Sequence, residues 1–294
     1  MKKKKITIGQ IILVMLFSIM ALAALIPVLL VLAASFSSQR SIDVKGFSFF
    51  PMEWSLAGWG YVVGLGKQLI TSYGVSIFTA VVGTFSSLLI ESMFAYALSR
   101  RQFKLRGFLS FMLLFTMLFS GGQLAGYIIN SQVYHLKNTW FILLKPTVAA
   151  MHVIMLRSYI QSNITDAVVE SAKIDGAGEF RCYIQIVMPL MPPVLASIGF
   201  MQAITEWNSW QQAYIYISDL KKTPLQLLLM RTEKLIASLD SANLPSYALS
   251  ELEKGLPREP ARMAFLFTVM VPVMILYPFF QKYFIKGLTV GSVK

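Results

Sequence analysis

Long apolar runs dominate this sequence and restrict its fold more than any other feature. The first run extends from Ile11 to Ala34 and is interrupted only by Ser18 and Pro27. At the rise of an α-helix it would reach about 36 Å, which exceeds the roughly 30 Å of hydrocarbon in a bilayer. Only 14% of the residues are charged, well below the usual share in a soluble domain. The sequence therefore predicts an integral membrane protein, and the length of this run favours a retained span over a cleaved signal peptide.

Five further apolar segments predict membrane helices. We expect an all-α integral membrane fold with about six transmembrane helices and with both chain termini on the same side. A short tail, residues 1–10, precedes a single transmembrane domain that covers residues 11–294. The further predicted spans lie at about 71–98, 107–125, 139–156, 190–216 and 262–281.

The positions of lysine and arginine predict the orientation. Cytoplasmic loops of membrane proteins carry an excess of these residues, and the Lys2–Lys5 run together with the cations between residues 100 and 106 suits a cytoplasmic N-terminus. Both termini are then cytoplasmic (N-in, C-in), and the loop at about 157–189 is cytoplasmic as well. The segment at about 218–261 is external and contains "LQLLLMRTEKLIASL", which is typical of an amphipathic helix.

The cytoplasmic loop interrupts the apolar chain with a charged, glycine-containing pattern. Residues 163–177 predict a short helix that Asn163 or Thr165 caps. Its apolar stripe is Ile164, Val168 and Ala172, and Gly176 ends it. A second helix with a stripe of Phe180, Tyr183, Ile184 and Val187 follows and ends at Pro189. The loop is thus expected to form a helix–turn–helix elbow.

Two interpretations of this elbow remain open from its pattern. It could lie on the lipid surface, but interfacial helices usually carry lysine and arginine on their polar face. Acidic side chains outnumber basic ones here, which favours docking into a groove of another protein. The acidic residues are Asp166, Glu170, Asp175 and Glu179.

The elbow also resembles a known motif. "ESAKIDGAG" followed by "IVMPLMPP" is similar to the EAA loop of ABC-importer permeases: Glu170, Ser171 and Ala172 match its triplet, Gly176 its glycine and residues 186–189 its end. The resemblance continues in "EWNSW" at 206–210 and in the tail at 277–294, which are similar to carbohydrate-importer permeases. Within that family, the sequence "YPFFQKYF" most resembles the branch associated with complex oligosaccharides derived from polysaccharides.

This resemblance implies a multi-pass permease subunit of an ATP-driven sugar importer in the bacterial cell membrane. It further implies a second homologous permease in a heterodimer, two ATPase subunits, an extracellular sugar-binding protein and an oligosaccharide substrate. The chain has no G-x-x-x-x-G-K-[ST] sequence, so ATP and Mg²⁺ are expected on the partner ATPase, and this chain is expected to be no enzyme and to hold no cofactor. The residues expected to couple to the ATPase are Glu170, Ser171, Ala172, Asp175 and Gly176.

The stretch "EWNSWQQAYIY" at 206–216 combines aromatic rings with amide and hydroxyl groups. Sugars are bound through such groups, because rings stack on apolar sugar faces and hydroxyls need hydrogen-bond partners. The alternative is an aromatic belt at the membrane interface. Asn208 and Gln212 are four residues apart and are expected to share a helix face, beside Trp207 and Gln211. These four residues are the candidate substrate path.

Other features exclude or weaken further functions. His135 and His152 have no metal-ligand spacing, and Cys182 is the only cysteine, so we expect no metal site. The net charge of +12 is explained by the membrane orientation and does not require nucleic acid. Glu91 lies within a predicted span, where we expect it near the interface beside Arg100. An ion-coupled secondary transporter and a purely structural membrane subunit remain the alternative functions.

Overall fold

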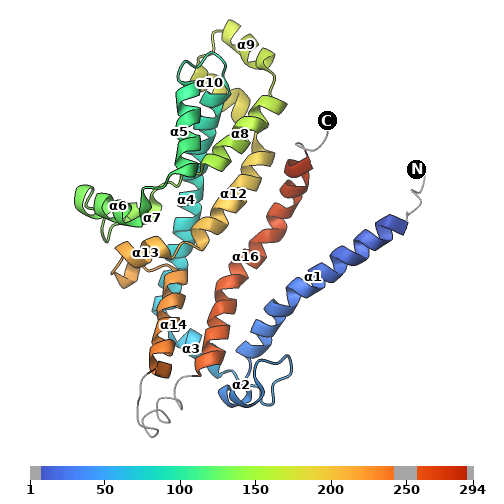
Figure 1. Ribbon diagram of the computed structural model, residues 1–294, viewed down its shortest axis with the longest axis vertical. Coiled ribbons are helices and arrows are strands. Elements are labelled where there is room, and N and C mark those ends of the chain that lie inside the picture. Colours follow the sequence, from blue (N-terminus) through green and yellow to red (C-terminus); the bar gives the residue numbers. More distant parts are fainter. Residues whose placement is uncertain (1–7, 242–256, 290–294) are drawn as a thin grey trace. The chain divides into compact units, whose positions relative to one another are not determined.

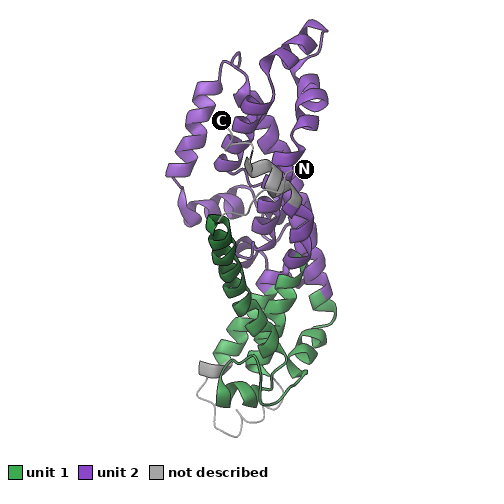
Figure 2. Ribbon diagram, turned by 90° about the vertical axis from the view of Figure 1, so that its right-hand side faces the viewer, with its two compact units in different colours: residues 1–69, 228–272 green, residues 70–227, 273–294 purple. Residues whose placement is uncertain are grey.

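The computed structural model describes residues 8–241 and 257–289, and these are almost entirely helical (Figure 1). They form two compact units, one from residues 1–69 and 228–272 and the other from residues 70–227 and 273–294 (Figure 2). In the described ranges the only β-structure is an isolated antiparallel bridge between Ser37 and Trp54. The all-α fold predicted from the sequence is confirmed.

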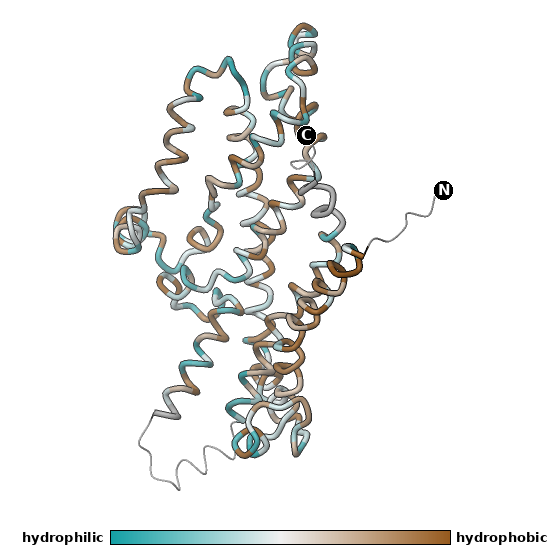
Figure 3. Tube along the Cα trace, turned by 45° about the vertical axis from the view of Figure 1, so that its right-hand side comes forward, coloured by the Kyte–Doolittle hydropathy of each residue, from teal (hydrophilic) through white to brown (hydrophobic). Residues whose placement is uncertain are grey.

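The first unit begins with α1 (Ile8–Ser35), an apolar helix with exposed side chains. Figure 3 shows its hydrophobic colouring along nearly the whole helix. Only Ala34 and Ser35 are buried, at the end that leads into the rest of the unit. A helix that is apolar on every side and packs against so little protein is suited to face lipid.

A close backbone contact joins the other parts of the first unit. The short helix α3 (Ala57–Gly64) approaches the start of α16 (Arg258–Thr289), where a Cβ atom on Gly58 would lie 2.5 Å from the carbonyl oxygen of Pro260. The Glu259 N–H also donates to Gln39 Oε1 over 2.9 Å, which ties α16 to α2 (Gln39–Lys45). Glycine at position 58 is what permits this approach.

The second unit is organised around α4 (Lys67–Ser99), a helix of 33 residues. Around it lie shorter helices, several of them interrupted. These are α5 (Arg106–Leu118), α6 (Gly122–Ile128), the π-helix η1 (Ile129–Val133), α7 (Trp140–Leu144), α8 (Ala150–Asn163), α9 (Asp166–Ile174), α10 (Glu179–Cys182), the π-helix η2 (Tyr183–Val187), α11 (Met188–Leu190), α12 (Pro192–Trp207), α13 (Gln211–Tyr216), the 3₁₀-helix η3 (Leu220–Lys222) and the start of α14 (Leu225–Ser241).

A row of buried polar side chains runs along α4, and each member satisfies a polar group of another segment. Ser76 Oγ accepts the Leu225 N–H over 2.8 Å at the start of α14. Ser87 Oγ accepts the Thr147 N–H over 3.0 Å. Glu91 Oε1 accepts the Ala149 N–H over 2.8 Å, and Ser92 Oγ lies 2.8 Å from the Tyr183 hydroxyl. We call Ser76, Ser87, Glu91 and Ser92 the polar row of α4. It stabilises the points at which neighbouring segments break, because buried backbone N–H groups need acceptors.

Among the described residues, α1, α4 and α16 are each long and apolar enough to cross a membrane. Two bent pairs would bring the number to five if each pair is one span. In the first, Arg106–Leu118 and Gly122–Val133 meet at 113°, and in the second, Glu179–Leu190 and Pro192–Tyr216 meet at 83°. The third predicted segment, 107–125, is therefore not one continuous helix, because α5 ends at Leu118. A Gly-Gly pair follows shortly after, and its second member, Gly122, has a positive φ of 80°.

The predicted span at 139–156 is divided in the structure. The helix α7 stops at Leu144, residues 145–149 are not helical, and α8 begins at Ala150 and continues to Asn163. Pro146 explains the break, because proline has no N–H to donate and disfavours helical geometry at the residue before it. Glu91, which we expect near the membrane interface, is fully buried within the protein.

The predicted amphipathic helix in the segment 218–261 is present as α14. Its apolar side chains include the fully buried Leu227 and Ile236, so part of its apolar face is covered by protein.

Candidate functional site

The elbow lies at one end of the second unit, where Figure 1 shows α9 and α10 beyond the end of α8. Its first helix, α9, begins after Thr165, which occupies the N-cap position with extended backbone angles but makes no side-chain cap hydrogen bond. Asn163 still belongs to α8, where its side-chain amide donates to the Tyr159 carbonyl. Asp166 lies in the first turn of α9, where a negative charge is favourable.

Gly176 ends α9 as the sequence predicts. Its φ is +85°, which places it in the left-handed region. The Gly176 N–H donates to the Lys173 carbonyl over 3.0 Å, and the Ala177 N–H donates to the Ala172 carbonyl over 2.9 Å. These two bonds form a Schellman motif, which satisfies carbonyl groups that the helix end would leave open. The chain can then reverse into α10.

The buried face of α9 differs by one position from the predicted stripe. Val169 is 1% exposed and Ile164 is 4% exposed, whereas the predicted Val168 is 44% exposed. Ala172 is partly buried against the same apolar core. Because α9 starts only at Asp166, Ile164 is not part of the helix. The four-residue spacing from Ile164 to Val168 therefore does not place the two side chains on one helix face.

The second half of the elbow contains the five-residue π-helix η2. The wider π-helical turn shifts the register, so the predicted stripe is divided. Tyr183 and Val187 are buried, whereas Phe180 and Ile184 are exposed. Cys182 is also buried, and its thiol lies 3.8 Å from the Ala177 carbonyl oxygen.

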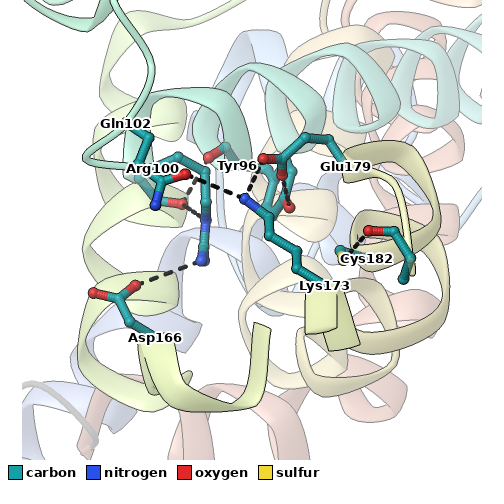
Figure 4. Close-up of polar contacts among 9 residues, drawn as sticks. Tyr96, Arg100, Gln102, Asp166, Lys173, Glu179 and Cys182 are labelled. Atoms are coloured by element: carbon teal, nitrogen blue, oxygen red, sulfur yellow. Dashed lines mark hydrogen bonds and ion pairs between the residues drawn. The ribbon is translucent and has the colours of Figure 1, made fainter. Parts of the chain in front are cut away.

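The elbow is anchored to the end of α4 by a network of charged and aromatic groups (Figure 4). The Tyr96 hydroxyl donates to Glu179 Oε2 over 2.7 Å, and Lys173 forms an ion pair with Glu179 Oε1. Arg100 lies over the Tyr96 ring, with its guanidinium carbon 5.0 Å from the ring centre, and 3.5 Å from Asp166 Oδ1. Partial burial alone would raise the pKa of the Glu179 carboxyl, but its hydrogen bonds from Lys173 and Tyr96 outweigh this and lower the pKa.

Several side chains of the elbow outside this network are exposed. Ile174 is 86% exposed and Phe180 is 65% exposed, and both are large apolar side chains. Glu170, Ser171 and Asp175 are exposed between or beside them. We call these five residues the elbow tip. A rigid base with an exposed apolar and acidic tip is the arrangement expected of a surface that docks on a protein partner.

The second candidate set lies at the other end of α12 from the elbow. The helix α12 stops at Trp207, Asn208 is its C-cap, and α13 starts at Gln211. Asn208 and Gln212 therefore do not share one continuous helix face, which corrects our expectation. The break comprises residues 208–210, where the Trp210 N–H donates to the Asn208 carbonyl over 3.0 Å and makes no hydrogen bond of the α-helical pattern.

The four predicted path residues have different surroundings. Trp207 is buried, and its ring centre lies 6.3 Å from that of Tyr73 on α4. Asn208 is exposed, and its Oδ1 accepts a hydrogen bond from Gln226 over 2.9 Å. Gln211 and Gln212 are exposed at the start of α13. The structure thus brings three amide side chains to one exposed break, while the indole supports the packing behind it.

Position 206 in the same motif is also explained by packing. Gln202 Nε2 donates to Glu206 Oε1 over 2.8 Å. A Cβ atom on Gly83 would lie 3.1 Å from the Glu206 carboxyl carbon, so glycine leaves room on α4 for this side chain. In the described part of the chain, no three His, Cys, Asp or Glu side chains are grouped so that they could hold a metal ion.

Comparison with known proteins adds the remaining evidence. No protein-family model matches the chain. It is 34% identical over 276 residues to the "Polygalacturonan/rhamnogalacturonan transport system permease protein YtcP" of Bacillus subtilis, covering 93% of this chain and 94% of the relative. It is 27% identical to the "Arabinooligosaccharides transport system permease protein AraQ" of Halalkalibacterium halodurans, covering 100% of both. Among solved structures, a bacterial ABC transporter involved in the import of the acidic polysaccharide alginate matches with a TM-score of 0.78 and 30% identity, covering 97% of this chain and 99% of the other.

Proposed function

Because this chain belongs to the permease subunits of carbohydrate ABC importers, we propose that it moves a polysaccharide-derived oligosaccharide inward when a partner ATPase acts on its elbow. As a member of this family, the chain is a multi-pass transport subunit of the cell membrane. The relatives support neither of the alternative functions, an ion-coupled secondary transporter or a structural subunit, because they are permeases of ATP-driven importers.

The observation that carries the proposed coupling is the geometry of the elbow. Its tip exposes Ile174 and Phe180 beside Glu170 and Asp175, while its base is fixed to α4 through Glu179. Docking in an ATPase groove would remove the apolar side chains of the tip from water, which favours binding. A force on the tip would then pass into the base. ATP and Mg²⁺ belong to the ATPase in this proposal, since the chain has no phosphate-binding loop of the Walker A type.

The proposed assembly contains a second homologous permease, two ATPase subunits and an external sugar-binding protein. The substrate proposal is supported by the relatives, whose names refer to polygalacturonan, rhamnogalacturonan and arabinooligosaccharides. It is also supported by the exposed amides of Asn208, Gln211 and Gln212, which offer both donors and acceptors to sugar hydroxyls.

Purification of the tagged chain from its native membrane tests this proposal. We expect a second permease and an ATPase to co-purify. After reconstitution in liposomes, the complex should take up oligosaccharide only with ATP and with the loaded binding protein. Isolation of the chain without an ATPase, together with uptake that depends on an ion gradient, would contradict the proposal.

A prediction concerns the amides of α13. Replacing both Gln211 and Gln212 with leucine should lower oligosaccharide uptake by about thirtyfold, because each lost hydrogen bond to a passing sugar hydroxyl weakens its binding by roughly 1 kcal/mol. Assembly should be unchanged, since both side chains are exposed. The measurement is uptake by the reconstituted complex, with subunit content checked on the same sample.

Thr205→Val is the matched control for this pair. The Thr205 hydroxyl already donates to the Met201 carbonyl within α12, so its loss should leave uptake near the wild-type rate. Wild-type uptake by the double leucine variant would assign Gln211 and Gln212 to an interfacial belt instead.

A further inference from the structure

Glu91 has an unusual environment for a carboxylate in a membrane-spanning helix. Its side chain is fully buried. Oε1 accepts the Ala149 N–H over 2.8 Å and lies 3.2 Å from His152 Nδ1. Oε2 is buried and has no hydrogen-bond partner within the described ranges. A buried carboxylate oxygen without a partner is costly, so packing alone would favour an apolar residue here.

The contacts of Glu91 converge on the first turn of α8. Ala149 is the N-cap of α8, and its methyl group provides no cap hydrogen bond. His152 is the third helical residue, the position from which a Glu side chain reaches back to the N-cap N–H in a capping box. Here the carboxylate comes from α4 instead, and it contacts both the N-cap N–H and the His152 ring. The N-terminus of α8 is therefore held by another helix rather than by its own residues.

Glu91 acts together with Ser87, one turn earlier on α4. Ser87 Oγ accepts the Thr147 N–H over 3.0 Å. The non-helical segment 145–149, which separates α7 from α8, is thus held at two of its backbone N–H groups by one face of α4. A non-helical segment without such contacts would deform easily, because no helix or strand hydrogen bonds stabilise it.

The other end of α8 leads directly to the elbow. Only Ile164 and Thr165 separate α8 from α9. Along its length α8 packs into the apolar core through Val153, Leu156 and Ile160, which are all fully buried. We expect a displacement of the elbow to be passed along α8 to the contacts that hold its first turn.

We propose that Glu91 is a positioning residue for coupling, which fixes the first turn of α8 to α4, so that α4 and both ends of α8 move together with the elbow and the movement is not absorbed in segment 145–149. The inference rests on the proposed function, because it assumes that the elbow is displaced during transport. Glu91 acts through Ala149 and His152 and does not contact the transported sugar in this mechanism.

Three variants of the reconstituted complex test this role. Glu91→Leu removes the acceptor and should raise the ATP hydrolysed per sugar transported by about tenfold or more. The reason is that a buried hydrogen bond to a carboxylate favours the arrangement in which α8 is attached to α4 by that factor. Glu91→Gln keeps an oxygen acceptor for the Ala149 N–H and should restore most of the coupling. Ser87→Ala removes only the Thr147 contact and should change the ratio in the same direction by less.

Thr79→Val serves as the matched control on α4. Thr79 is also buried, but its hydroxyl donates only to carbonyls of its own helix, those of Val75 and Ser76. This variant should keep the wild-type ratio of ATP to sugar. Wild-type coupling in Glu91→Leu would overturn the proposal, as would a Gln variant that couples no better than the Leu variant.

A second measurement does not require transport. Spin labels at the exposed Met151 of α8 and Phe85 of α4, in a Cys182→Ser background, report the distance between the two helices. We expect one narrow distance distribution with Glu91 and a broader one in Glu91→Leu. An unchanged distribution would refute the positioning role even if the complex proved to be driven by an ion gradient. A broadened one together with ATP-independent uptake would refute only the proposed function.

Discussion

Replacing Gly176 with proline is expected to abolish ATP-driven uptake while the chain still inserts into the membrane. Gly176 has a φ of +85°, whereas proline fixes φ near −65°. The substitution also removes the N–H that donates to the Lys173 carbonyl. Together these changes cost about 3 kcal/mol or more. The end of α9 would have to adopt another backbone conformation, which would displace the elbow tip. Uptake by the reconstituted complex and retention of the ATPase on the tagged chain measure the effect.

Two variants bracket this result. Gly176→Ala keeps the N–H but places a Cβ in the left-handed region, at a cost of roughly 1–2 kcal/mol, so uptake should fall only partly. Gly178→Ala should be close to wild type, because Gly178 has a φ of −71° and a Cβ there would meet no atom within 4 Å. Full uptake and full ATPase retention in Gly176→Pro would show that the elbow does not couple.

Replacing Gly58 with alanine should reduce the amount of folded protein sharply. The new Cβ would lie 2.5 Å from the Pro260 carbonyl oxygen and 2.6 Å from its carbonyl carbon. Both are backbone atoms, and no side-chain rotation can relieve the contact, so α3 and the start of α16 would have to separate. Overpacking of this kind costs about 1–3 kcal/mol. The thermal unfolding temperature and the yield of monodisperse protein in detergent are the measurements.

Gly60→Ala is the control in the same helix. A Cβ at position 60 would meet no atom within 4 Å, and alanine is favoured over glycine in a helix by roughly 0.5–1 kcal/mol. This variant should be as stable as the wild type or slightly more so. Equal stability of the position 58 and position 60 variants would contradict the close approach of α3 to α16.

The elbow could be predicted from the sequence because its signals are local. Gly176 supplies a left-handed residue after a short amphipathic segment, and the structure shows the complete Schellman motif there. The predicted buried face is wrong by one residue, with Val168 in place of Val169, because the predicted stripe starts at Ile164, which lies before the first residue of α9. The π-helical turn at 183–187 left no clear signal in the sequence.

The contacts between distant segments could not be predicted in the same way. Nothing near Glu91 in the sequence points to Ala149 or His152, which are 58 and 61 residues away. A partial signal existed. Ser87 and Glu91 are four residues apart on one face of a predicted span, and Pro146 predicts a helix break whose backbone groups need acceptors. Likewise, Trp207 at the end of α12 packs against Tyr73 of α4, a contact that a residue pattern does not reveal.

The polar row of α4 also has a consequence for the order of events during synthesis. Its side chains leave the ribosome long before their partners: Thr147 follows Ser87 by 60 residues, Tyr183 follows Ser92 by 91, and Leu225 follows Ser76 by 149. At about 5–20 residues per second, the last of these delays is of the order of ten seconds. The partners of Glu91 follow it by 58 and 61 residues, so its carboxylate lacks them for about 3–12 seconds, and placing it in lipid during that time would cost roughly 3 kcal/mol. We therefore expect α4 to remain beside the insertion machinery, or to re-enter the bilayer late, until the segments that it holds have been made.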